Sequence, residues 1–331
     1  MVIYIKNRLS KKNYNLLAII IERFGIISML VILSIIFGIF VPRFFTLQNF
    51  TNISMQAVPI GFLALGLMFV LISGGIDLTA GIGVSLAAVV MNFFFILTRS
   101  ATLAIMFGFL SVLLLGAING LLISKARFQS IIVTLIMMTI TLGIVFIIYN
   151  LSPETLNISN LFFKFIARKR LVGIPASFVI MSFVYFISYI VLNHTRFGLY
   201  LLAIGGNQEG ARITGIKIDK YIFYTYVISG FFMGLSSLIL VARVSYITPR
   251  LGGTSLLLDT LAAIIIGGVL ISGGKGTIQG VLIGTLSITI INNMVSMVDI
   301  HPAWNDFFKG IVIILMMLFN RMVSILEETR I

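Results

Sequence analysis

Residues 57–97 read AVPIGFLALGLMFVLISGGIDLTAGIGVSLAAVVMNFFFIL, and this stretch decides the fold class. It contains two apolar runs, Ala57–Ser73 and Gly81–Leu97. Each run approaches the roughly 20 residues that an α-helix needs to cross a bilayer. The polar segment between them includes Ser73, two glycines and Asp77. Because irregular backbone at membrane depth needs protein or a water-filled cavity around it, the stretch predicts two membrane helices joined by a broken segment.

The remainder of the chain has the same character. Of its 331 residues, 59% are hydrophobic and 10% are charged, and the mean hydropathy is +1.14. These values are typical of membrane proteins. About ten apolar runs are long enough to span a bilayer, so we predict an all-α integral membrane protein of about ten transmembrane helices. The cores of these runs are Gly25–Phe40, Ala57–Ser73, Gly81–Leu97, Thr102–Ile123, Phe128–Tyr149, Ala176–Asn193, Tyr221–Arg243, Ser255–Ile271, Gly276–Met297 and Ala303–Asn320.

The distribution of basic residues predicts the orientation. An even number of spans places both termini on one side, and the loops on that side carry more lysine and arginine than the others. The basic stretch 167–170 falls on the opposite side. We therefore expect a cytoplasmic N-terminal tail (1–23), a transmembrane domain (24–321) and a short cytoplasmic C-terminal tail (322–331).

The net charge of +13 raises the question of a nucleic-acid partner. The charges are dispersed among short loops and form no basic patch interleaved with aromatic residues, so we expect no nucleic-acid binding. Positive loops held at an anionic inner leaflet account for the charge.

The sequence offers little for catalysis. It has no cysteine, and its two histidines, His194 and His301, fall in loops predicted on opposite sides. The stretch Ser272–Thr277 resembles a phosphate-binding loop. It lacks the first glycine of that motif, because Val269 stands there, and Gly276 follows the lysine in place of Ser or Thr. We expect no enzyme activity, no cofactor and no metal.

The polar loop His194–Lys220, HTRFGLYLLAIGGNQEGARITGIKIDK, has the signals of a short helix. Gly205-Gly206-Asn207 is a helix-start signal, with two flexible glycines followed by a side chain able to cap free backbone N–H groups. Glu209 and Arg212 suit the two ends of the helix dipole, and Gly215 is a helix stop. The loop therefore predicts a helix of about two turns that docks on a partner.

Small residues also recur at helix-packing intervals, in Gly116/Gly120, Gly230/Gly234 and Gly276/Gly280/Gly284. This spacing predicts close helix crossings. In addition, residues 71–75 and 270–274 both read LISGG, with a glycine six residues after the last one in each case. Matching glycine-interrupted segments are typical of duplicated transporters, in which they mark the pathway.

Ionisable and amide side chains within the apolar regions are pathway or gating candidates. Asp77 is either such a group, together with Ser73, Gly74 and Gly75, or a cap for the helix starting near Thr79. Asp259 leaves the same two alternatives open. Amides that are candidates for the pathway or for interhelical hydrogen bonds are Asn92, Asn119, Asn292 and Asn293.

Several of these motifs together resemble the permease subunits of bacterial ATP-binding-cassette (ABC) importers of the ribose, xylose and autoinducer-2 group. The coupling-helix motif is matched by Gly205-Gly206-Asn207, Ala211 and Gly215-Ile216. The departures are Gly210, where the family usually has alanine, and the basic stretch 167–170. The likeness extends over most of the chain after about residue 40, through Phe44-Phe45-Thr46, Asn49, 73–81, 194–198, Leu258-Asp259, Gly267-Gly268, 273–276 and Asn292-Asn293.

The resemblance implies an all-α permease in the bacterial cytoplasmic membrane that pairs with a second copy or a paralogue. It also implies an extracytoplasmic sugar-binding protein and a pentose, hexose or small polyol as cargo. A cytoplasmic ATPase would contact the coupling helix at Gly206, Asn207, Glu209, Ala211, Arg212, Gly215 and Ile216.

Two other functions stay open at this point. The cargo could be autoinducer-2 or a nucleoside, within the same family. An ion-coupled secondary transporter would use Asp77 and Asp259, although both fall nearer the ends than the centres of the predicted spans.

Overall fold

The computed structural model describes residues 43–151, 169–171, 173–244 and 247–297 continuously, with isolated positions at 31, 34, 35, 38, 39, 41, 307, 310, 311 and 314. The predicted spans Gly25–Phe40 and Ala303–Asn320, and both predicted tails, lie outside the continuously described ranges.

The described residues are almost entirely helical. Seven helices are long and apolar enough to cross a membrane, which confirms the all-α membrane class. The described part does not confirm a count of ten. The elements are α3 (Leu47–Ile72), α4 (Ala80–Thr98), α5 (Ala101–Ser124), α6 (Ser130–Leu151), β1 (Arg170–Leu171), β2 (Ile174–Pro175), α8 (Ala176–His194), α9 (Arg196–Gly206), α10 (Gln208–Ile213), α11 (Ile218–Arg243), α12 (Gly253–Ile266) and α13 (Ile278–Met297).

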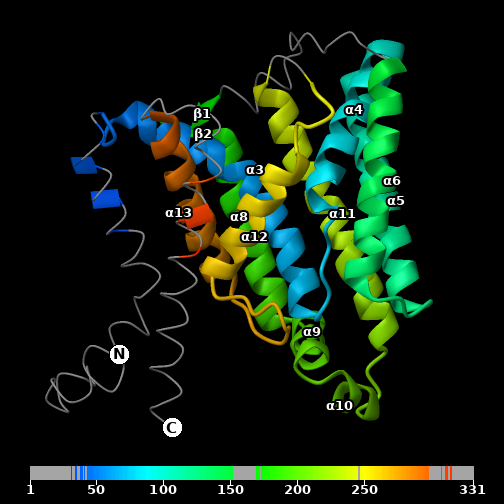
Figure 1. The fold of residues 1–331 in the computed structure, drawn as a ribbon. Coiled ribbons are helices and arrows are strands. Elements are labelled where there is room, and N and C mark those ends of the chain that lie inside the picture. Colours follow the sequence, from blue (N-terminus) through cyan, green and yellow to red (C-terminus); the bar gives the residue numbers. More distant parts are fainter. Residues whose placement is uncertain are drawn as a thin grey trace, which may run out of the picture.

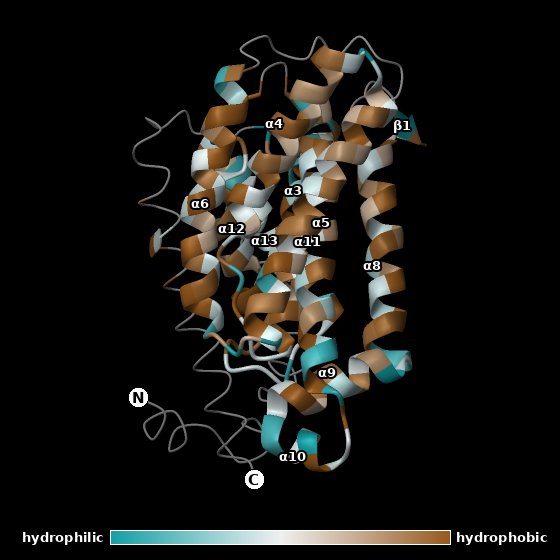
Figure 2. Ribbon diagram, turned by 90° about the vertical axis from the view of Figure 1, so that its right-hand side faces the viewer, coloured by the Kyte–Doolittle hydropathy of each residue, from teal (hydrophilic) through white to brown (hydrophobic). Residues whose placement is uncertain are grey.

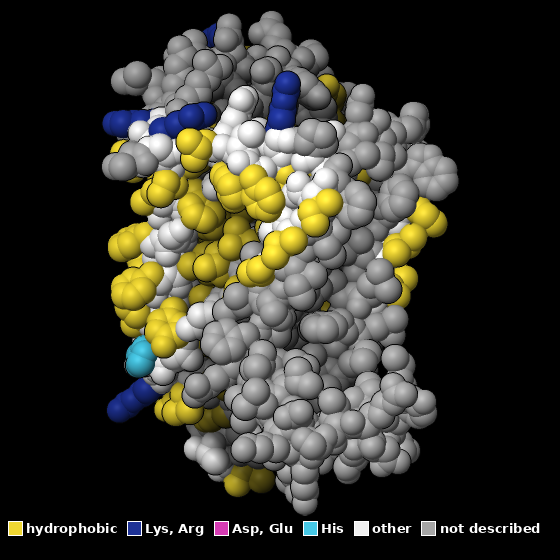
Figure 3. Space-filling model, turned by 90° about the vertical axis from the view of Figure 1, so that its left-hand side faces the viewer, with side chains coloured by type: hydrophobic (Ala, Val, Ile, Leu, Met, Phe, Trp, Pro, Cys, Tyr) yellow, Lys and Arg dark blue, Asp and Glu magenta, His cyan; other side chains and the backbone are white. Residues whose placement is uncertain are grey.

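Helices α3, α4 and α11 form the centre of the bundle, and α5, α6 and α8 surround them. In the most hydrophobic part of α3, 89% of the residues are buried, compared with 22% in α6. The outer helices are nevertheless apolar on their exposed faces (Figure 2). Figure 3 shows hydrophobic side chains on one face of the molecule between basic side chains near both ends. Such a surface is suited to contact with lipid.

Helix α3 starts ten residues before the predicted apolar core, at Leu47. Polar residues in its first turns hid this start from the hydropathy pattern. The Thr46 side chain caps the helix by accepting a hydrogen bond from the Asn49 N–H at 3.2 Å. The Asn49 amide is buried and donates to the Phe44 carbonyl at 2.9 Å. These local contacts explain how a polar sequence begins a buried helix.

Glycine seams hold the helices together as predicted. A Cβ at Gly116 on α5 would lie 2.3 Å from the Tyr226 carbonyl oxygen on α11, and one at Gly230 would lie 2.3 Å from the Val112 oxygen. On α13, a Cβ at Gly284 would lie 1.9 Å from the Ala263 oxygen of α12. Backbones approach this closely only where side chains are absent.

The predicted span Ser255–Ile271 is wrong in its bounds. Helix α12 has 14 residues, or about 21 Å at 1.5 Å per residue, which falls short of a bilayer core. Its first turn packs inside the bundle, where the Gly252 N–H donates to Ser85 Oγ at 2.9 Å. A Cβ at Gly81 would lie only 2.1 Å from the Gly253 carbonyl oxygen. The start of α12 therefore meets the start of α4 within the protein.

The two ends of the bundle differ. Helices α9 and α10 lie at the lower end in Figure 1, and the β1–β2 hairpin lies at the upper end. We call these the α10 end and the opposite end. The α3–α4, α5–α6 and α12–α13 connections all reach the α10 end, as their contacts with α9 and α10 show.

Candidate functional site

Helix α10 forms where the sequence predicted it and has six residues. Asn207 is the N-cap, and its Oδ1 accepts from the Gly210 N–H at 2.9 Å. Glu209 and Arg212 form an exposed ion pair at 3.6 Å. At the other end, Gly215 has a φ of +83°, a left-handed conformation that glycine adopts without strain. The Ile216 N–H then donates to the Ala211 carbonyl and closes the helix at 3.3 Å.

Ala211 is the inward-facing residue of α10. Its side chain is buried in a small apolar cluster with Ile204 of α9 and Ile218 of α11. Ile216 packs against the same cluster. The cluster fixes α10 to the helices on either side of it, so Ala211 holds the helix in position from within this chain.

Gly205 and Gly206 are not the flexible residues before a helix that the sequence predicted. They are the last two residues of α9. A Cβ at Gly205 would lie 1.8 Å from the Ile72 carbonyl oxygen and 2.5 Å from the Gly274 nitrogen. Close backbone approach, and not flexibility, explains glycine at Gly205.

The close backbone contact at Gly205 also brings the two LISGG segments, 71–75 and 270–274, together. The Gly274 N–H donates to the Ile72 carbonyl at 3.0 Å. A Cβ at Gly273 would lie 3.0 Å from the Gly74 Cα, and one at Gly274 would lie 2.8 Å from the Gly206 Cα. We call Gly74, Gly205, Gly206, Gly273 and Gly274 the glycine junction. It joins the end of α9, next to α10, to the broken segment before α4 and to the connection before α13.

The broken segment 73–79 enters the bundle and is held there by hydrogen bonds. Asp77 is fully buried. One of its carboxyl oxygens accepts from both the N–H and the hydroxyl of Thr79, and the other accepts from Ser229 Oγ of α11 at 2.8 Å. Asp77 therefore holds the backbone just before α4, whereas the helix N-cap itself is Thr79, without a side-chain cap. It does so from the interior and not from a solvent-facing position.

Neighbouring helices satisfy the backbone of the break. The Ile76 carbonyl accepts from the Tyr226 hydroxyl at 3.2 Å, and the Ile76 N–H donates to Ser130 Oγ at 3.3 Å. Asn119 of α5 donates to Thr79 Oγ1 at 3.0 Å. Sequence reasoning missed Ser130, Tyr226 and Ser229, because single hydroxyls in apolar helices give no signal of their own.

Asp259 lies in the middle of α12, and not near the end of a span as predicted. Its Oδ2 accepts from Asn292 Nδ2 of α13 at 2.8 Å, so the structure brings these two candidates together. The carbonyl oxygens of Asn292 and Asn293 are buried and have no hydrogen-bond partner among the described residues. Asn92 is buried on α4.

These groups are arranged to hold and to move backbone segments. No three His, Cys, Asp or Glu side chains gather as a metal site within the ranges that the structure describes. What the site provides is a capped exposed helix, a backbone junction behind it and two buried acids beyond.

Comparison with known proteins gives a consistent result. Residues 49–317 match the family described as branched-chain amino acid transport system / permease component. The ribose import permease protein RbsC of Escherichia coli K12 is 31% identical over 94% of this chain and 97% of its own length. The Bacillus subtilis protein of that name is 34% identical over 91% and 94% of the two chains.

The L-arabinose ABC transporter permease protein AraH of Azospirillum brasilense is 31% identical over 91% of this chain and 88% of its own length. No solved structure matches the chain. The family model covers most of the chain and the relatives cover nearly all of it, so the resemblance seen in the sequence is confirmed. The chain therefore belongs to this family of transport-system permeases and is a multi-pass membrane permease of the ABC transporter class.

Proposed function

We propose that this chain is the membrane subunit of an ATP-driven importer for a small sugar, with a pentose such as ribose as the first candidate. The similar proteins are named for ribose and L-arabinose, which supports a sugar more than autoinducer-2 or a nucleoside. The sequence has no complete phosphate-binding loop, so ATP hydrolysis belongs to a separate cytoplasmic ATPase.

The observation that carries this proposal is helix α10. It is capped at both ends, and its Ile213 side chain is 81% exposed although the helix is otherwise polar. An apolar side chain presented on a rigid polar helix suits insertion into a groove on a partner. The ATPase would dock here, with Glu209 and Arg212 at the rim. The α10 end then faces the cytoplasm.

The glycine junction gives a route from the ATPase to the spans. The cluster of Ala211, Ile204 and Ile218 makes α10 and α9 move together as a rigid body. Gly205 then presses directly on the Ile72 carbonyl and on Gly274. Displacement of α10 therefore reaches the broken segment before α4 and the connection before α13 at the same time.

The buried acids and amides would line the sugar pathway. Sugar hydroxyls need hydrogen-bonding partners, and Asn292 and Asn293 have carbonyl oxygens without a partner among the described residues. Asp259 would act as a further acceptor, and Asp77 would act by holding the broken segment in place. A second permease copy or a paralogue would complete the pore, and an extracytoplasmic binding protein would deliver the sugar at the opposite end.

Two variants separate docking from transmission. Ile213→Asp should lower co-purification of the ATPase about tenfold or more, because loss of a buried apolar anchor is worth roughly 2 kcal/mol. Ile213→Leu is its control and should bind normally.

Gly205→Ala should keep the ATPase but lose sugar uptake in proteoliposomes. Gly143→Ala, where the added Cβ meets open space on α6, is the control and should keep both ATPase binding and uptake.

Full ATPase recovery with Ile213→Asp would rule out docking at α10. Uptake driven by an ion gradient without any ATPase would instead establish a secondary transporter.

A further inference from the structure

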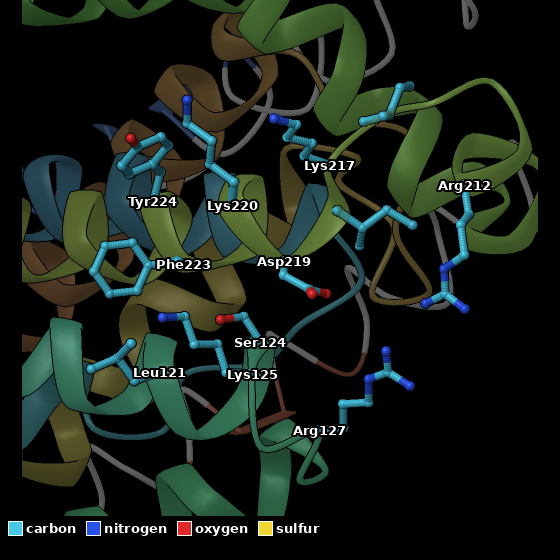
Figure 4. Close-up of a pocket in the computed structure, with 12 residues that line it drawn as sticks. Leu121, Ser124, Lys125, Arg127, Arg212, Lys217, Asp219, Lys220, Phe223 and Tyr224 are labelled. Atoms are coloured by element: carbon cyan, nitrogen blue, oxygen red, sulfur yellow. The ribbon is translucent and has the colours of Figure 1, made fainter.

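A cavity of about 610 Å³ opens at the α10 end, between the α5–α6 connection and the first turns of α11. Five basic side chains line it, from three stretches of the chain (Figure 4). We call this the basic pocket, and its cations are Lys125, Arg127, Arg212, Lys217 and Lys220.

The charges of the basic pocket are only partly balanced within the described part of the chain, where Glu209 pairs with Arg212 at 3.6 Å. Asp219 is the one acidic residue among the lining side chains, and it forms no ion pair with the described residues. Figure 4 shows the guanidinium groups of Arg127 and Arg212 pointing toward one another. Two converging guanidinium groups repel each other unless an anion lies between them, and phosphate is the anion that their planar donors fit best.

A second observation points to a ligand. Ser124 is only 3% exposed and lines the basic pocket. Its Oγ is buried and finds no hydrogen-bond partner among the described residues. A buried hydroxyl left without a partner is destabilising, so a ligand that supplies an acceptor oxygen would satisfy it. An adjoining polar cavity of about 440 Å³ is lined by Ser124, Arg127 and Arg212 as well.

The other wall of the pocket is apolar. Leu121, Phe223 and Tyr224 line it. From Leu121, the exposed face of α5 continues toward the opposite end through Ile118, Leu114 and Leu110. A small anion would have no use for this wall, whereas a phospholipid would lay its acyl chains along it. Basic pockets beside membrane helices are a known mode of binding acidic lipid headgroups.

We propose that the basic pocket binds an anionic phospholipid of the leaflet at the α10 end. The phosphate lies between Arg127 and Arg212 and accepts from Ser124, and the acyl chains lie against Leu121 and α5. Arg127 belongs to the α5–α6 connection and Arg212 to α10, so the lipid ties α10 to the bundle. The proposal does not depend on the nature of the cargo or on ATPase docking.

The test is lipid retention by the full chain in nanodiscs of mixed phosphatidylglycerol and phosphatidylcholine, followed by native mass spectrometry after release. Phosphatidylglycerol should stay bound in preference to phosphatidylcholine. Arg127→Gln and Lys125→Gln should each lower its retention about fivefold, since a basic residue near an anionic surface contributes roughly 1 kcal/mol. Arg196→Gln, which removes the same charge outside the pocket at the α10 end, is the matched control and should retain the lipid.

Three results would overturn the proposal. The first is equal retention of both lipids. The second is displacement of the lipid by inorganic phosphate alone at low millimolar concentration, because it would show a site for a free anion. The third is unchanged lipid retention by Arg127→Gln together with loss of ATPase co-purification, which would make the pocket a protein-docking surface.

Discussion

Asp77 combines full burial with complete hydrogen bonding. Its carboxyl group accepts from two groups of Thr79 and from Ser229, and Asn119 extends the network through Thr79. A buried acid in such a network holds the broken backbone in place, and the network also sets the direction of the first turn of α4. Any role in the pathway would be exerted from this position.

Substitutions at Asp77 should distinguish these roles. Asp77→Ala leaves the donors of Thr79 and Ser229 without partners and should destabilise the fold by about 3 kcal/mol. Asp77→Asn should cost about 1 kcal/mol, because one amide oxygen still accepts and the Ser229 hydroxyl can turn to accept from the amide nitrogen. Thermal unfolding in detergent measures both variants.

Sugar uptake measured on the Asp77→Asn variant then separates the two functions. We expect uptake to fall while the melting temperature changes little. Normal uptake would leave Asp77 with the single role of holding the broken segment in place. Ser229→Ala, which removes one donor and keeps the carboxyl group, is the control for loss of a single hydrogen bond.

Among the elements, α3 shows how a helix tolerates a proline deep in the bundle. Pro59 has no N–H, so the carbonyl of Met55, four residues earlier, loses its helical partner. Arg243, the last residue of α11, donates to that carbonyl at 2.9 Å, and Ser236 donates to the Pro59 carbonyl at 2.9 Å. Helix α11 thus supplies the hydrogen bond that the Met55 carbonyl lacks within α3 and adds a second one at the Pro59 carbonyl, which holds the two central helices in register.

This arrangement predicts energetic coupling between Pro59 and Arg243. Arg243→Met should destabilise the protein by about 2 kcal/mol, the typical value for a hydrogen bond to a charged donor. In combination with Pro59→Ala the same substitution should cost clearly less, because the helix then satisfies the Met55 carbonyl itself. A double-mutant cycle on thermal stability measures the difference.

Arg250→Met, at the same end of the bundle, should show no such coupling to Pro59. Additive effects of Pro59→Ala and Arg243→Met would mean that the contact between the two helices is not energetically significant.

In the molecule as a whole, the two ends of the bundle carry different structural features. The α10 end gathers α9, α10, the glycine junction and the basic pocket. The opposite end carries the β1–β2 hairpin and the α4–α5 connection (Figure 1). Positive loops predict that the α10 end is cytoplasmic, and the proposed ATPase docking requires it.

The orientation can be measured directly, because the sequence has no cysteine. Gln208→Cys places a single thiol on α10, and Thr98→Cys places one at the opposite end. In intact cells a membrane-impermeant maleimide should label Thr98→Cys and spare Gln208→Cys. Permeabilised cells should label both, which controls for accessibility. The reverse pattern in intact cells would invert the topology and exclude a cytoplasmic ATPase on α10.

Local chemistry let the sequence determine much of this protein. Apolar run length predicts membrane helices, because an uninterrupted helix is the simplest way to satisfy backbone polar groups in lipid. The two ends of α10 could be predicted because Asn207 and Gly215 interact only with backbone groups a few residues away. The glycine seams were readable because small residues at four-residue intervals allow backbones to meet. For the same reason the family was recognisable from these motifs.

Only the tertiary structure decided the rest, because those features depend on contacts between distant residues. Helix α12 ends at Ile266, where Gly267 meets Gly280 of α13, and hydropathy could not show this. The sequence predicted Gly205 to be a flexible residue, although in the structure its backbone contacts Ile72 and Gly274. Ser124 and Ser229 carried no signal in sequence, since the partners that a hydroxyl finds, or lacks, are known only once the helices are packed.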